Sequence, residues 1–165
     1  MHLRNAAPVL MACLTVLLMG TAAAPANAAA AKVTWLAVQD DPRLSRARLE
    51  RAVLGQPAGT ALDAFKVALS EASTPVDVDL QVVADAPSAR AAAMRAEKAG
   101  HLAVVADLPA LWLAAASEGT KLAVLNIGAA EDSLREADCK RNLLHFAPSE
   151  RMKADALAQW LVARQ

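Results

Sequence analysis

Short apolar runs alternate with longer helical patterns along most of this chain. We expect strands at residues 33–38, 76–83, 101–106 and 121–125, and a short extended piece at 143–146. Helical patterns separate them and follow the last one, at 60–72, 89–99, 109–119 and from 148 onward. Strands joined through helices favour a parallel sheet with helices on both faces, because the crossovers are right-handed. The sequence therefore predicts an α/β fold with a Rossmann-like, three-layer arrangement.

Local signals place the ends of several of these elements. Thr60 is expected to cap a helix with Asp63 in its first turn, and Gly100 to end the helix before the third strand. Residues 76–83 alternate between apolar and polar, which predicts a strand near the edge of the sheet. Residues 43–51 are charged, and a solvated helix and a loop both fit them. The three tryptophans and Leu111 fall on predicted inner faces, so core packing is expected of Trp35, Trp112 and Trp160.

The first 28 residues are typical of an export signal rather than of a folded domain. A weakly basic start precedes an apolar run over residues 6–19, which is shorter than the ~20 residues of a membrane-spanning helix. Ala26-Asn27-Ala28 fits a signal-peptidase site, so we expect cleavage near Ala28 and a single domain over residues 29–165. A retained membrane anchor and a lipoprotein site at Cys13 are the alternatives.

Charge and missing motifs exclude several classes of function. The chain carries 17 basic and 17 acidic residues with no basic cluster, which argues against a nucleic-acid partner. A dinucleotide glycine motif, a phosphate loop and a nucleophile elbow are all absent from the sequence, so we expect no enzyme activity and no cofactor. No spacing of His, Cys and carboxylates suggests a metal site, and Cys139 has no partner once Cys13 leaves with the signal.

Polar residues follow the predicted strands at their carboxyl ends, where parallel α/β sheets bind ligands. For several of these residues, a purely structural role is an alternative to ligand binding. Asp107 fits a helix cap as well as a ligand contact, Asn126 fits both a structural role and a ligand contact, and His145 fits a strand-end hydrogen bond. The candidate ligand-binding residues are Gln39, Asp40, Asp107, Asn126, Gly128 and His145.

Residues from 102 onward resemble a known family. Residues 104–110 read VVADLPA and residues 125–129 read LNIGA, and residues 134–149 read LREADCKRNLLHFAPS. Together with residues 152–159, they resemble the N-terminal lobe of type I periplasmic substrate-binding proteins of ABC transporters, in particular the subgroup found with PQQ-dependent alcohol dehydrogenase systems. The resemblance implies a periplasmic receptor that captures a small-molecule solute and docks on an ABC permease in the inner membrane, with a periplasmic dehydrogenase as a further partner.

Two departures from that family's pattern change the expectation. The family's amino-acid receptors hold the ligand carboxylate with hydroxyl and amide groups, whereas this chain places Asp107 there, and like charges repel. The resemblance also implies two lobes, and we expect only the first in this chain, with the second lobe absent. A truncated reading frame, a stand-alone interaction module without a ligand and a small α/β hydrolase remain as alternatives.

Overall fold

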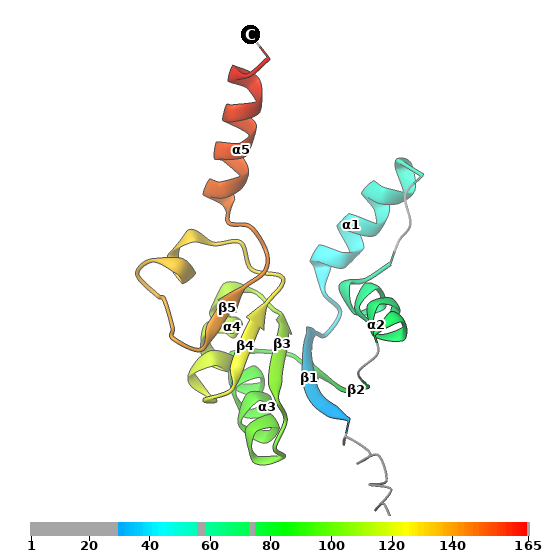
Figure 1. Ribbon diagram of the computed structural model, residues 1–165, viewed down its shortest axis with the longest axis vertical. Coiled ribbons are helices and arrows are strands. Elements are labelled where there is room, and N and C mark those ends of the chain that lie inside the picture. Colours follow the sequence, from blue (N-terminus) through cyan, green and yellow to red (C-terminus); the bar gives the residue numbers. More distant parts are fainter. Residues whose placement is uncertain (1–29, 56–58, 73–74, 165) are drawn as a thin grey trace, which may run out of the picture.

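The computed structural model describes residues 30–55, 59–72 and 75–164, and it contains five parallel strands. The strand order β2-β1-β3-β4-β5 and the intervening helices confirm the predicted α/β fold with a parallel sheet (Figure 1). The expected export signal at residues 1–28 lies outside the described residues. The elements are β1 (Ala31–Val38), α1 (Pro42–Val53), α2 (Ala61–Glu71), β2 (Val76–Val83), α3 (Ala86–Lys98), β3 (Ala103–Asp107), α4 (Ala110–Glu118), β4 (Ala123–Asn126), the 3-10 helix η1 (Asp132–Arg135), β5 (Leu143–His145) and α5 (Glu150–Val162).

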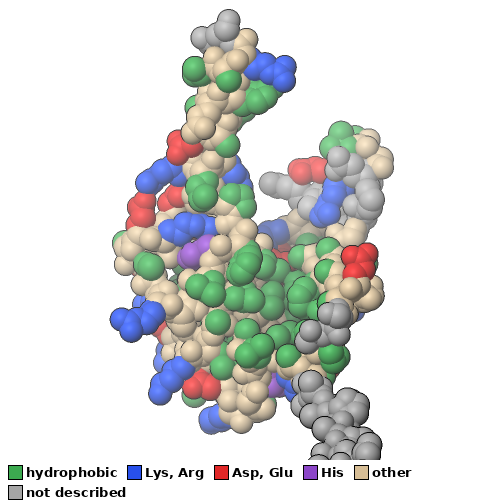
Figure 2. All heavy atoms as spheres, viewed as in Figure 1, with side chains coloured by type: hydrophobic (Ala, Val, Ile, Leu, Met, Phe, Trp, Pro, Cys, Tyr) green, Lys and Arg blue, Asp and Glu red, His purple; other side chains and the backbone are tan. Residues whose placement is uncertain are grey.

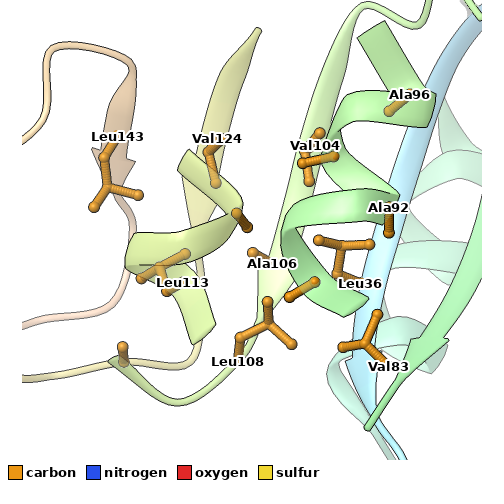
Figure 3. Close-up of a cluster of buried hydrophobic side chains, with 14 of the residues drawn as sticks. Leu36, Val83, Ala92, Ala96, Val104, Ala106, Leu108, Leu113, Val124 and Leu143 are labelled. Atoms are coloured by element: carbon orange, nitrogen blue, oxygen red, sulfur yellow. The ribbon is translucent and has the colours of Figure 1, made fainter. Parts of the chain in front are cut away.

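The main hydrophobic core lies between one face of the sheet and helices α3 and α4 (Figure 3). Leu36, Val104 and Val124 point into it from the three central strands, and Leu113 comes from α4. The buried side of α3 is made only of alanines, namely Ala89, Ala92, Ala93 and Ala96. Small side chains let a helix lie close to its neighbours, which explains how an alanine-rich chain builds a well-packed layer.

The opposite face of the sheet carries a row of apolar side chains, one from each strand. Paired residues of parallel strands point to the same side, so the strand register defines this row as Leu80, Trp35, Val105, Leu125 and Leu144. Phe65 of α2 packs against this row at Trp35, with the two ring centres 5.3 Å apart. The two ends stay open, since Leu80 is 48% exposed and Leu144 is 47% exposed.

Several local signals act as the sequence predicts. Thr60 caps α2 in a reciprocal capping box with Asp63, and Gly100 has a φ of +74° just after α3. The alternating strand β2 lies at the edge of the sheet, as expected. Residues 43–51, for which helix and loop both fitted, belong to helix α1.

Other expectations about packing are wrong. Leu111 is 72% exposed, because α4 turns Leu113 and Ala116 toward the core instead. Trp160 is 53% exposed, with the guanidinium of Arg164 4.7 Å from its ring centre, and no residue of α5 is buried, so no other described element covers the predicted inner face of this helix. Within that part of the chain, no helix is long and apolar enough to cross a membrane.

Candidate functional site

The carboxyl ends of the strands bring the predicted site residues to one end of the sheet. Gln39 and Asp40 follow β1 and are exposed, and Asp40 adopts a φ of 48° in the turn. Asp107 ends β3, Asn126 ends β4 and His145 ends β5. The structure brings the predicted residues together in two pairs, Asp107 with Gly128 and Asn126 with His145.

The group around Asp107 contains a guanidinium between two carboxylates. Arg43 donates from Nη2 to Asp41 Oδ2 at 2.6 Å and from Nε to both oxygens of that carboxylate at 3.0 Å. The same Nη2 reaches Asp107 Oδ1 at 3.2 Å and the Asp107 carbonyl oxygen at 3.1 Å. This group, which we call the acid–arginine cluster (Asp41, Arg43 and Asp107), ties the start of α1 to the end of β3.

The two carboxylates of the acid–arginine cluster titrate differently. Burial alone would raise the pKa of Asp41, but its hydrogen bonds to Arg43 and the charge of Arg43 outweigh burial and lower that pKa. Burial raises the pKa of Asp107 above its usual value, and the attraction of Arg43 only partly opposes this. With both carboxylates ionised, the cluster holds two negative charges against one positive charge. It therefore favours a cationic or hydrogen-bond-donating group over an anion.

A hollow with a volume of about 580 Å³ lies beside the cluster. Asp107 contributes its polar wall from the sheet, and the two helices that follow β1 contribute the rest. Its other lining residues are Leu44 and Arg51 of α1, Gly59 and Thr60 of the turn, and Ala61, Asp63, Ala64 and Val67 of α2. Arg51 is fixed by donating from Nη1 to the Gly59 carbonyl oxygen at 3.1 Å. The hollow thus combines apolar walls with a few convergent polar groups, as small-molecule sites do.

Gly128 lies directly against Asp107. A Cβ atom at this position would be 2.4 Å from Asp107 Oδ1 and 3.2 Å from Arg43 Nη1, so only glycine lets the loop after β4 approach this closely. The predicted residues Asp107 and Gly128 are therefore neighbours.

Asn126 uses its side chain entirely within the protein. It is fully buried, and its Oδ1 accepts from the N–H groups of Gly128 at 3.2 Å and Ala129 at 2.9 Å. Its Nδ2 donates to the Ala129 carbonyl oxygen at 2.7 Å and lies 3.0 Å from His145 Nδ1. Asn126 therefore shapes the loop that carries Gly128, and direct ligand contact by its side chain stays a prediction.

His145 accepts the remaining Nδ2 hydrogen of Asn126. The backbone N–H partners of Asn126 fix which of its atoms is oxygen, so Nδ2 must be the donor and His145 Nδ1 the acceptor. Burial, aided by the positive charge of Arg135, lowers the pKa of His145. A neutral imidazole suits this contact, because a protonated Nδ1 would have no lone pair to offer.

Sequence reasoning missed Asp41 and Arg43. Asp41 belongs to the polar turn after β1. Arg43 begins the charged segment 43–51, for which the sequence predicted either a helix or a loop. The signal for both was available, because a charged pair directly after a buried strand lies at the carboxyl end of the sheet. Its connection to Asp107, 64 residues away in the chain, comes only from the fold.

Comparison with known proteins finds a likeness to one solved structure. No family model matches this chain, and no curated protein does. A solved structure of a leucine-, isoleucine-, valine-, threonine- and alanine-binding protein from Brucella ovis, in its closed conformation, matches 73% of this chain with a TM-score of 0.50 and 19% identity. The likeness concerns the fold alone, a parallel α/β sheet that this chain shares with part of that binding protein. This chain spans about a third of that structure's length, since the match covers 33% of it.

Proposed function

We propose that this protein is a periplasmic solute-binding component of an ABC transport system and not an enzyme. The fold supports this role, and the hollow beside Asp107 is the observation that carries it. The solute binds at the carboxyl ends of the strands, and the loaded protein then docks on a permease in the inner membrane. Capture is non-covalent, so the site needs complementary groups and no nucleophile.

The charge of the acid–arginine cluster specifies the class of solute. Arg43 is already engaged by Asp41 and Asp107, so it is poorly placed to bind a ligand carboxylate. Asp107 is partly exposed and can accept a hydrogen bond from an ammonium or hydroxyl group. We therefore propose a small amine or polyol with an apolar part, which the side chains of Leu44 and Val67 contact in the hollow.

Gln39, Asp40 and His145 remain in the proposal as surrounding contacts at the same end of the sheet. Gln39 and Asp40 are exposed beside the cluster and supply further polar groups to a solute. His145 acts through Asn126, which sets the loop of Gly128 against Asp107. In this arrangement, Asp107 determines most of the preference for one solute over another, and the other residues make smaller contributions to that preference.

Isothermal titration calorimetry of the full chain against amines, polyols, amino acids and simple carboxylates tests this proposal. We expect an amine or a polyol to bind and Asp107→Asn to weaken that binding by roughly 10-fold, since one charge-assisted hydrogen bond becomes a neutral one. Glu136→Gln, which lies in another part of the surface, is the matched control and leaves binding unchanged. Exclusive binding of carboxylates, or binding that Asp107→Asn does not alter, would contradict the proposal.

A narrower proposal connects the solute to PQQ-dependent alcohol oxidation and adds a periplasmic dehydrogenase as a partner. It rests on the resemblance of residues 134–159 to that subgroup. Short-chain alcohols and their aldehydes belong in the calorimetric panel for this reason. Binding of an alcohol would support the link to alcohol oxidation. Binding of amines alone would contradict that link but would still agree with the proposed solute-binding role.

A further inference from the structure

Asp41 is a buried carboxylate that acts on the hollow only through Arg43. Its side chain is 4% exposed, whereas the side chain of Asp107 is 22% exposed and lines the hollow. The Asp41 carboxylate accepts hydrogen bonds from Nε and Nη2 of Arg43, and its Oδ1 also accepts from the Arg43 backbone N–H at 2.9 Å. A solute in the hollow therefore contacts Asp107 rather than Asp41.

The two carboxylates of the acid–arginine cluster hold the guanidinium unequally. Asp41 receives two nitrogens of Arg43 at once, with Nη2 at 2.6 Å, and such two-pronged contacts are the strong form of an arginine–carboxylate pair. The Asp107 carboxylate receives only the shared Nη2, at 3.2 Å from its Oδ1. The contact with Asp41 therefore keeps Arg43 from a full pairing with Asp107, and part of the Asp107 carboxylate stays available to another donor.

The other charged groups that line the hollow have opposite signs. Arg51 of α1 and Asp63 of α2 contribute one formal charge each, and these cancel in sum. Leu44 and Val67 add apolar walls, and Figure 2 shows hydrophobic side chains gathered over the middle of the molecule in this view. Charges interact more strongly beside apolar groups than in open water. The formal charge of the acid–arginine cluster therefore determines which sign of charge the hollow favours in a solute.

We propose that Asp41 is the positioning residue that makes the hollow select a cation or a hydrogen-bond donor; this inference rests on the proposed solute-binding role. Asp41 holds Arg43 to one side, so Asp107 can accept from an ammonium or hydroxyl group. Without the charge of Asp41, a small rotation brings the guanidinium into full contact with Asp107, because the two groups are already 3.2 Å apart. Arg43 would then occupy the oxygens that the solute needs. Asp41 thus controls the specificity of the site without touching the solute.

Isothermal titration calorimetry of the full chain with butylammonium and butyrate, which have similar apolar tails, tests this role. The wild type should bind butylammonium more tightly than butyrate. Asp41→Asn should weaken butylammonium binding by roughly 10-fold, as much as Asp107→Asn does, although Asp41 lies outside the hollow. The double variant Asp41→Asn/Asp107→Asn leaves Arg43 as the only charge of the cluster, so its preference should reverse to butyrate. Glu136→Gln, on another part of the surface, is the control and leaves both affinities unchanged.

The pKa of Asp107, followed by NMR titration of its carboxyl carbon, separates this role from a purely structural role of Asp41. Burial raises the pKa of Asp107 in the wild type. In Asp41→Asn, full contact with Arg43 should lower the pKa of Asp107 below the ordinary aspartate value of about 3.9. Asp40→Asn removes an exposed charge from the same turn, and the pKa of Asp107 should stay raised in this variant.

The two measurements distinguish a failure of this inference from a failure of the proposed function. A wild type that binds neither probe would contradict the proposed solute class, whereas a lowered pKa of Asp107 in Asp41→Asn would still support the control of Arg43 by Asp41. A raised pKa of Asp107 in Asp41→Asn, or a double variant that still prefers butylammonium, would overturn the inference. If circular dichroism shows that Asp41→Asn does not fold, Arg43→Gln replaces it. Tighter binding of butylammonium by Arg43→Gln would support the inference, and weaker or unchanged binding would overturn it.

Discussion

The guanidinium of Arg43 lies 3.2 Å from the carboxylate of Asp107, although 64 residues separate them in the chain. This contact joins the first residues after β1 to the last residue of β3 at the end of the sheet where a solute is proposed to bind. Asp41 completes the arrangement, because its buried carboxylate fixes the same guanidinium through two of its nitrogens. The site is therefore held in shape before any ligand arrives, which lowers the entropy that binding must overcome.

Arg43→Gln should destabilise the protein by about 2 kcal/mol, because it leaves the Asp41 carboxylate buried without its counter-charge. The loss stays below that of a fully buried pair, since the Arg43 side chain is 39% exposed and solvent screens it. Urea unfolding followed by circular dichroism measures the change. Lys32→Gln is the control, because its ion pair with Asp77 is exposed on both sides and its loss should cost under about 0.5 kcal/mol. Equal effects of the two variants would show that Arg43 is not a structural residue.

Gly128→Ala should destabilise the protein by about 1–3 kcal/mol and weaken solute binding, because the new methyl group overlaps Asp107 Oδ1. The loop after β4 must then move, or the Asp107 carboxylate must leave Arg43. Gly59→Ala is the matched control for stability alone, since the atom nearest to its added Cβ, Asp63 Cβ, is 4.0 Å away. Thermal unfolding and calorimetric titration measure the two effects. A Gly128→Ala protein as stable as Gly59→Ala would refute the close approach.

The elements with strong local signals were predictable from the sequence, and those that depend on distant contacts were not. The alternating strand β2, the Thr60 cap and the turn at Gly100 follow from residue type and periodicity. The five-stranded parallel sheet follows from the order of the elements. These features depend on neighbours within a few residues or on general rules of chain connection.

The site was predictable only in part, for the same reason. Strand ends identify Asp107, Asn126 and His145 as candidates, but sequence alone does not show that Asn126 is fully buried. The partnership of Arg43 with Asp107 depends on where the turn after β1 places the start of α1 relative to the end of β3. The exposed side of α5 was predicted as a core face, because the spacing of apolar residues along a helix does not show which element, if any, packs against it.

Asn126→Ala should be one of the most destabilising single substitutions outside the hydrophobic core, at about 3 kcal/mol. It removes the acceptor of two buried N–H groups, those of Gly128 and Ala129, and it removes the donor to His145. Urea unfolding measures the loss. Ser133→Ala, an exposed change on η1 nearby, is the control with an expected effect within about 0.5 kcal/mol. Near-neutral behaviour of Asn126→Ala would mean that water replaces the lost hydrogen bonds.

The burial of His145, aided by the positive charge of Arg135, should make the stability of the protein depend on pH. Because the pKa of His145 is lowered in the folded protein, the unfolded chain takes up the proton first as pH falls. The stabilising contribution is therefore complete above the ordinary histidine pKa of about 6.5, and it is lost as pH falls through the lower pKa of the folded state. Free energies of unfolding at pH 8 and pH 5.5 should show this loss, and His145→Gln should reduce it.

Asn126→Asp provides the sharper form of this test, because it should reverse the sign of the effect. The introduced carboxylate keeps the acceptor for Gly128 and Ala129 but loses the donor, so at pH 8 no hydrogen lies between it and His145 Nδ1 in the present tautomer, and a contact requires the imidazole to move its proton from Nε2. At pH 5.5 a protonated His145 can donate from Nδ1 to that carboxylate, and opposite charges then attract. The variant should therefore gain stability relative to the wild type as pH falls. A penalty that is the same at both pH values would show that the ring of His145 does not sense residue 126.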